Sequence, residues 1–314
     1  MYRRILVPLD GTPEAEAALA PARTLATALS AEVVLISVVP TGGPSLKALE
    51  SPDLRQAHDY LAGVAPRVGS TQAEDQVAVV VSEGSPAETI VAEAKAREAD
   101  VIVMATHGRR GLERLVMGSV AERVLSTSPV PIVLIRPGAP RMQRLKLIVV
   151  PVDGSPESLV GVGSAAQLAR AAHAAIVLLR VVEPLPLWLY DPTLGLNTGP
   201  LIDPRWDEGR RESAERDVRN LAASLANSGL EVGGEAVLGE VASEIAEYAD
   251  QQAADLIVMA THARSGPARA LLGSVADEVV RRARQPVLLV NRNMLQQSHA
   301  VHTSFLSGGR TLSP

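Results

Sequence analysis

The chain has 314 residues, enough for two domains of ordinary size, and 46% of them are hydrophobic. Only 2% are aromatic and the formal net charge is −5, which argues against base-stacking platforms and against a large contact with a nucleic-acid backbone. Cysteine is absent, so disulfides, thiolate metal sites and a cysteine nucleophile are excluded. No apolar run approaches the roughly 18 residues of a membrane span, and we expect a soluble, cytoplasmic protein.

Short β-branched runs alternate with longer alanine-rich stretches in the first half of the chain. In chain order the pattern predicts a strand at 4–9, a helix at 13–29, a strand at 32–39, a helix at 52–65, a strand at 76–82, a helix at 86–97, a strand at 101–105, a helix at 119–127 and a strand at 130–135. Continuous apolar strands indicate burial on both faces, as in a parallel sheet covered by helices. The predicted fold is a doubly wound, Rossmann-like α/β domain with a five-stranded parallel sheet in the order 3-2-1-4-5.

Three helix starts carry explicit signals. Thr12-Pro13 and Ser155-Pro156 each combine an N-cap residue with a proline at the first helical position, and "SPAE" at 85–88 is a capping box. A second such sequence, "SVAE" at 119–122, predicts that a helix starts at Ser119.

The second half of the chain repeats the segments of the first half in the same order. "RRILVPLDGT" at 3–12 pairs with "KLIVVPVDGS" at 146–155, and "ADVIVMATH" at 99–107 pairs with "ADLIVMATH" at 254–262. This repetition indicates a tandem duplication of a whole domain. We expect domains at 1–137 and 145–293, a linker at 138–144 rich in proline and glycine, and a disordered tail at 294–314.

One segment is longer in the second half than in the first. Residues 184–205 are rich in proline and glycine and contain Trp188 and Tyr190. A surface loop that packs its own aromatic side chains is one interpretation. A lid over a ligand and a subunit contact are the alternatives, because long ordered loops are often functional.

Ligands of open α/β sheets bind outside the carboxyl ends of the strands, and two features of each half fall there. The first is an aspartate after the first strand, Asp10 or Asp153. The second is the loop after the fourth strand, at 106–118 or 261–273. In the first of these loops, glycines allow close approach of the backbone to a ligand, and two arginines supply positive charge.

The loop of the first half ends where a helix is expected to start, and the free N–H groups of a helix N-terminus attract phosphate. Loop and helix together predict a phosphate cradle, and Asp10 could hold ribose hydroxyls or an adenine amine, which suggests a nucleotide. The alternative is that Gly108 and Gly111 serve a turn and that Gly118 only precedes a helix cap.

Both halves resemble the universal stress protein family. The segments that carry the resemblance are "ILVPLDGT", "GSPAETIVAEA", "ADVIVMATHGRRGLERLVMGSVAERVL" and "SPVPIVLIR", with their second-half partners. The nucleotide-binding branch of that family is known by a Gly-2x-Gly-9x-Gly-Ser/Thr pattern. The first half departs from it at Ala105 but keeps Gly108 and Gly118-Ser119, whereas the second half has alanine at both of the first two glycine positions, 260 and 263.

The resemblance implies an ATP site in each half, with Mg²⁺ as a companion if the nucleotide is hydrolysed. Asp10 and the backbone at Val38 would hold the adenosine end, and the cradle would hold the phosphates. The predicted binding residues of the first half are Pro8, Asp10, Val38, Ala105, Gly108, Arg109, Arg110, Gly118, Ser119 and Val120. Those of the second half are Pro151, Asp153, Val181, Ala263, Arg264, Gly273, Ser274 and Val275. We expect the first site to be the better one, because alanine at 263 costs about 1 kcal/mol if that position needs a positive φ.

A regulatory or sensor module of the stress response, binding an adenine nucleotide with little or no hydrolysis, is the leading hypothesis. A weak Mg-dependent ATPase and a nucleotide-free interaction module are the alternatives. A nucleotidyl-transferring enzyme is disfavoured, because "DGTPE" stands where an "HxGH" signature would follow the first strand. Members of this family commonly dimerise through the last strand, so the edges at 131–136 and 286–291 are expected to pair within the chain as a pseudo-dimer. A homodimer of chains stays open.

Overall fold

The first domain alternates strands and helices along the chain. In the computed structural model, residues 2–40, 54–69, 77–106, 117–140, 142–185, 205–261, 272–290 and 294 are described. The strands are β1 (Arg4–Pro8), β2 (Glu32–Val39), β3 (Val77–Glu83), β4 (Val101–Ala105) and β5 (Ile132–Ile135). The helices are α1 (Leu19–Leu29), α2 (Leu54–Val64), α3 (Pro86–Ala96) and α4 (Ser119–Thr127), with short 3₁₀ turns η1 (Ala15–Ala18) and η2 (Ala65–Arg67).

The second domain repeats this series with one longer helix. Its strands are β6 (Leu147–Pro151), β7 (Ala175–Val182), β8 (Val232–Leu238), β9 (Leu256–Ala260) and β10 (Val287–Val290). Its helices are α5 (Ser158–Ala172), α6 (Arg205–Ala226), α7 (Val241–Gln251) and α8 (Ser274–Arg282). Helix α6 has 22 residues, whereas α2, at the same place in the repeat, has 11.

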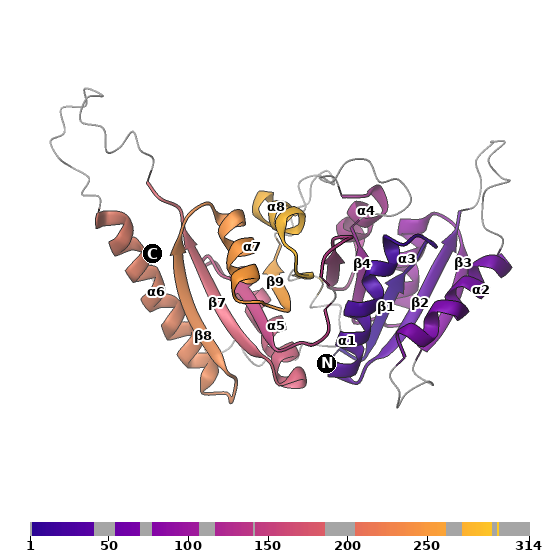
Figure 1. Cartoon of the computed structure of the whole chain (residues 1–314), viewed down its shortest axis with the longest axis horizontal. Helices are drawn as coiled ribbons and strands as arrows, with labels where there is room; N and C mark the ends of the chain where they lie inside the picture. Colours follow the sequence, from indigo (N-terminus) through magenta and orange to yellow (C-terminus); the bar gives the residue numbers. More distant parts are fainter. Residues whose placement is uncertain are drawn as a thin grey trace, which may run out of the picture.

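All the strands join one sheet. Its order is β3-β2-β1-β4-β5-β10-β9-β6-β7-β8, so each half has the predicted order 3-2-1-4-5. Pairing is parallel within each half, but β5 and β10 run antiparallel, with Leu134 opposite Val287 and Ile132 opposite Leu289. The two halves therefore pair through their last strands, and the sheet crosses the molecule without a break (Figure 1).

The central strands are apolar on both faces, because helices cover both. Along β1, Ile5 and Val7 belong to the core under α1 and α5, whereas Leu6 belongs to the core under α3, α4, α7 and α8. Both cores contain residues of both domains. Side-chain hydrogen bonds also tie the first half to the linker and to the second half. Thr24 Oγ1 donates to the carbonyl of Met142 in the linker (2.8 Å), and Arg136 donates to the Arg281 carbonyl (2.9 Å).

The repeated "AD" before the fourth strand of each half has a structural role. The Asp100 carboxylate accepts hydrogen bonds from the backbone N–H groups of Arg3 (2.6 Å) and Arg4 (3.0 Å). Asp255 accepts in the same way from Lys146 (2.8 Å) and Leu147 (3.0 Å). Each aspartate therefore fixes the entry of the central strand of its half.

Two helix starts differ from the predicted ones. The expected helix at 13–29 is divided into η1 and α1, and α5 begins at Ser158 rather than at Pro156. The hydroxyls of Thr12 and Ser155 accept from the N–H groups three residues on (3.2 Å each), but they donate to the preceding aspartates and so belong to the Asp-Gly turns.

Neither of the two predicted capping boxes forms its side-chain cap hydrogen bond. Ser85 is the N-cap of α3 and Pro86 its first residue, as predicted, but the Ser85 side chain makes no cap hydrogen bond. Glu88 instead lies 3.6 Å from Arg123 of α4. Helix α4 does start at Ser119, although its N-cap is Gly118, one residue before the box.

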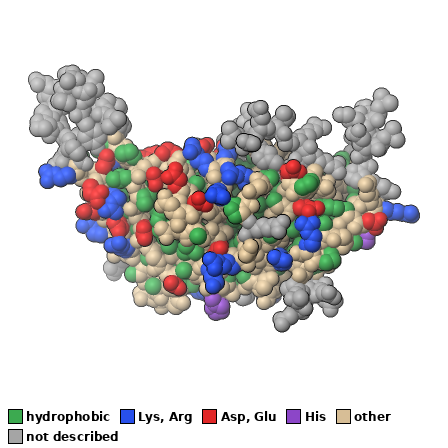
Figure 2. Space-filling view, viewed as in Figure 1, with side chains coloured by type: hydrophobic (Ala, Val, Ile, Leu, Met, Phe, Trp, Pro, Cys, Tyr) green, Lys and Arg blue, Asp and Glu red, His purple; other side chains and the backbone are tan. Residues whose placement is uncertain are grey.

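The surface of α6 carries an ion-pair ladder. Arg211 pairs with Glu208 and Glu215, and Arg219 also pairs with Glu215. Figure 2 shows acidic and basic side chains intermixed over this end of the molecule. Across the residues that the structure describes, no helix is both long and apolar enough to span a membrane.

A matched pair of glycines tests how closely α6 packs on β8. A Cβ on Gly234 would lie 2.7 Å from the Val218 carbonyl oxygen of α6, whereas one on Gly233 would find nothing closer than 4.0 Å. We expect Gly234→Ala to lower the free energy of unfolding by about 1–3 kcal/mol through overpacking, and Gly233→Ala to leave it nearly unchanged. Urea unfolding measures both; equal stability of the two variants would contradict this packing.

Candidate functional site

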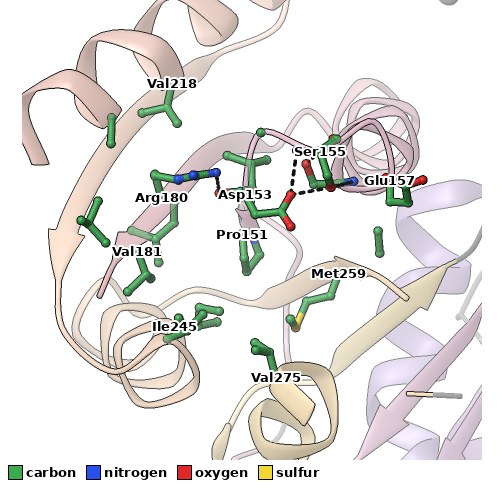
Figure 3. A pocket seen from close by; sticks show the side chains of 18 of the residues that line it. Pro151, Asp153, Ser155, Glu157, Arg180, Val181, Val218, Ile245, Met259 and Val275 are labelled. Atoms are coloured by element: carbon green, nitrogen blue, oxygen red, sulfur yellow. Dashed lines mark hydrogen bonds between the residues drawn. The ribbon is translucent and has the colours of Figure 1, made fainter. Parts of the chain in front are cut away.

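A cavity of about 870 Å³ lies at the carboxyl edge of the sheet in the second domain, a volume within the roughly 300–1,000 Å³ range of ligand sites. The β6–α5 turn and the end of β7 form one part of its wall. Helices α6 and α7, the end of β9 and the start of α8 form the rest (Figure 3).

The cavity brings together predicted residues that are far apart in the sequence. Those of the second half that line it are Pro151, Asp153, Val181, Gly273, Ser274 and Val275. Ala263 and Arg264, like Gly108, Arg109 and Arg110 of the first half, lie outside the described residues. Apolar side chains of α7 and β9, Ile245 and Met259, complete a lining that mixes aliphatic surface with a few polar groups.

Asp153 is held by the residue two positions on. Its Oδ1 accepts hydrogen bonds from the backbone N–H (2.9 Å) and the hydroxyl (2.5 Å) of Ser155. Burial alone would raise the pKa of Asp153, but the hydrogen bonds from Ser155 and Ser158 lower it below its usual value, so the carboxylate is ionised at neutral pH. Gly154 has a φ of 83°, which the turn requires and glycine readily adopts.

The first domain has the same turn. Asp10 Oδ1 accepts from the N–H (3.0 Å) and the hydroxyl (2.5 Å) of Thr12, and Gly11 also has a φ of 83°. Asp10 is half-buried, whereas Asp153 is exposed at the mouth of its cavity. The sequence D-G-[S/T] therefore forms the same turn in both domains, and the turn orients a carboxylate just beyond the central strand.

The start of α8 supplies the electropositive part of the cavity wall. Gly273 is its N-cap, and the Gly273 carbonyl accepts the first helical hydrogen bond, from Asp277 N–H (3.1 Å). The amides of Ser274 and Val275 lie in the first turn, where a helix has no internal acceptors for its N–H groups. With the helix dipole, these amides favour an anion.

The two cradles differ in backbone conformation. Gly273 has a φ of 75°, whereas Gly118, at the same place before α4, has a φ of −63°. The N–H of Gly118 donates to the Thr106 carbonyl (2.8 Å), so this amide is already bonded within the chain, and the predicted phosphate donors beside it are the amides of Ser119 and Val120. Of the other predicted residues, Pro8 and Ala105 are buried at strand ends, and Val38 is half-buried near the end of β2.

The sequence reasoning missed the α6 wall and Arg180. Arg180 lines the cavity from β7, and α6 contributes Arg210, Ser213 and Asp217. Aligning the halves would have flagged Arg180, because Ser37 stands at its place in the first half. The same alignment could not identify the α6 residues of the wall, since α6 has no counterpart of the same length in the first half.

The described residues contain no group of three or more histidine, cysteine, aspartate or glutamate side chains that could hold a metal ion.

The model of the universal stress protein family matches residues 1–136 and 145–291, and the chain belongs to this family as a tandem, two-domain member. A universal stress protein of Methanocaldococcus jannaschii is 33% identical over 150 residues, covering 47% of this chain and 82% of that protein. A universal stress protein from Mycolicibacterium smegmatis is 27% identical over 302 residues, covering 91% of this chain and 96% of that protein.

Solved structures support the same fold. A universal stress protein from Archaeoglobus fulgidus superposes with a TM-score of 0.68 at 18% identity, over 93% of this chain and 99% of that one. Another universal stress protein, solved in complex with cAMP, covers 46% of this chain and 96% of its own at 26% identity, with a TM-score of 0.33.

The Asp153 turn gives a pH-dependent prediction. Ser155→Ala removes the hydroxyl donor to Oδ1, so the pKa of Asp153 should rise towards 3.8. Because the pKa is lowered in the folded state, this bond stabilises the protein above the unfolded pKa, and that contribution is lost as the pH falls through the folded pKa. Carboxyl-carbon NMR titration of Asp153 measures the shift. Thr12→Ala, in the other domain, is the control, and an unmoved midpoint in Ser155→Ala would contradict the assignment.

Proposed function

We propose that this protein is a cytoplasmic regulatory module of the stress response that binds ATP at the carboxyl edge of each half-sheet, with little or no hydrolysis. The observation that carries the proposal is the cavity of the second domain, which an ionised aspartate and the N-terminus of α8 both face. An acceptor for hydroxyls or an amine and an anion-attracting helix end are what the two ends of a nucleotide need.

The residues present fit such a ligand. Asp153 and the backbone at Val181 would hold the adenosine end, and Ile245, Met259 and Val275 give the apolar surface that a base contacts. The amides of Ser274 and Val275 would hold the phosphates. The corresponding groups of the first domain are Asp10, Val38, Gly118, Ser119 and Val120. Mg²⁺ would be held chiefly by the phosphate oxygens and would neutralise part of their charge.

The two sites should differ in affinity for ATP. Gly108 of the first half lets the backbone approach the phosphates closely, whereas Ala263 stands at that position in the second half. If the position takes a positive φ, alanine costs about 1 kcal/mol there, so the first site is proposed to be the tighter one.

Calorimetric titration of the nucleotide-free chain with ATP and Mg²⁺ tests the proposal. We expect two unequal binding events. Asp10→Asn should weaken the tighter one and Asp153→Asn the weaker one, each about tenfold, because a hydrogen bond to a charged group contributes about 1.5–3 kcal/mol.

Asp59→Asn on α2, whose side chain is 86% exposed, is the matched control and should bind ATP as the wild type does. No heat of binding, or the same affinities in all three variants, would overturn the proposal. ADP accumulating during the titration would instead favour a weak ATPase.

A further inference from the structure

Arg180 lies beside the turn that presents Asp153. One guanidinium nitrogen is 3.5 Å from the Val152 carbonyl oxygen and 3.3 Å from where a Cβ on Gly154 would be. Val152 and Gly154 flank Asp153, so the positive charge is placed at the adenosine end of the proposed site. Figure 3 shows the Arg180 side chain reaching from β7 towards this turn.

The charge of Arg180 is not neutralised by any described carboxylate. Glu157, Glu183 and Asp217 line the same cavity, but no ion pair joins them to Arg180 within the described part of the chain. The other described arginine of the lining, Arg210, differs, because it pairs with Asp207 at 3.1 Å. A cation that faces a cavity with only one long hydrogen bond is suited to an anionic group of a ligand.

The first domain has the opposite arrangement at this corner. The strand register places Ser37 one residue beyond Ile36, the partner of Pro8, as Arg180 follows Leu179, the partner of Pro151. Ser37 is uncharged and 5% exposed. The second half thus has a cation at a position where the first has a buried hydroxyl.

The two halves also differ at an acidic position near this turn. Glu16 of the first half, six residues after Asp10, corresponds to Leu159, six residues after Asp153, and Leu159 lines the cavity. In the first domain, Glu16 forms an ion pair with Arg67 (2.6 Å) and accepts a hydrogen bond from the Tyr60 hydroxyl (3.3 Å). In the second domain, the described residues at this place, Leu159 and Arg180, line the cavity instead.

The cavity thus has two anion-attracting groups on different walls. Figure 3 shows Arg180 and Val275, at the start of α8, well apart, with Pro151 between them. If the α8 N-terminus takes the 5′-phosphates, Arg180 meets the ribose. In dinucleotide-binding folds, an arginine beside the ribose-binding acid accommodates a 2′-phosphate.

We propose that Arg180 makes the second domain selective for adenine nucleotides that carry a second phosphate on the ribose, at the 2′ or 3′ position. The first domain, with Ser37, takes the unmodified ribose. This inference rests on the proposed nucleotide site and specifies its ligand class in the second half.

The test compares ligands that differ by one phosphate. In the Asp10→Asn chain, where the first site is weakened, calorimetry fitted to two sites measures the Kd of AMP, adenosine 2′,5′-bisphosphate and adenosine 3′,5′-bisphosphate. We expect one bisphosphate to bind at least about tenfold more tightly than AMP, as a charge-assisted contact provides. Whichever isomer is preferred identifies the phosphorylated position.

Adding Arg180→Ser, which installs the residue of the first domain, should reduce the bisphosphate-to-AMP preference to near unity. Arg180→Lys should keep part of it, because the charge remains. Arg219→Ser on the solvent side of α6 is the matched control and should leave the preference unchanged.

A preference that survives Arg180→Ser, or equal binding of AMP and both bisphosphates, would overturn this inference while leaving the proposed nucleotide site intact. Failure of all three ligands and of ATP to bind would overturn both.

Discussion

The antiparallel pairing of β5 with β10 is the interaction on which the rest of the molecule depends. Each of these strands is the last of its half-sheet and is buried along its whole length. Left unpaired, either would expose a row of backbone donors and acceptors together with apolar side chains, which is an aggregation hazard. Pairing within the chain removes both edges and lets the two cores run across both domains.

Because all the strands within each half are parallel to one another, each half has a single carboxyl edge, where its loops and helix N-termini meet. The duplication keeps the parts that build this edge: the strand-fixing Asp100 and Asp255 and the two Asp-Gly turns. The parts that would touch a ligand have diverged, as Arg180 against Ser37 shows. Under the proposed function, a repeated scaffold would thereby present two sites that need not bind the same molecule.

The fold could be predicted because its signals are local and occur twice. Apolar runs indicate buried parallel strands, and the repeated segments indicate two copies of one domain. The pairing of the last strands followed from the family resemblance alone. The starts of α1 and α5 were not predicted, since Thr12 and Ser155 also bond to the preceding aspartates and so belong to the Asp-Gly turns as well as to the helix approach.

The candidate site was predictable at the turns and at the helix starts, where glycine and aspartate have few structural alternatives. Its side wall was not, because the residues of α6 reach the cavity only through the length and packing of that helix. The positive φ of Gly273 and the negative φ of Gly118 could not be predicted from the sequence either, since glycine adopts both conformations. As ligand-binding residues all the predicted positions stay predictions, and Gly108, Arg109, Arg110, Ala263 and Arg264 also lie outside the described residues.

Nucleotide content is the most direct measure of the central claim, that the carboxyl edges of this sheet are adenine-nucleotide sites of unequal affinity. Freshly purified protein would be denatured and the released small molecules identified by chromatography and mass. We expect one ATP per chain, from the first domain, with any further nucleotide carrying a ribose phosphate. Two ATP per chain would contradict the inequality of the sites, and a chain that releases no nucleotide and binds none when it is added would contradict the account as a whole.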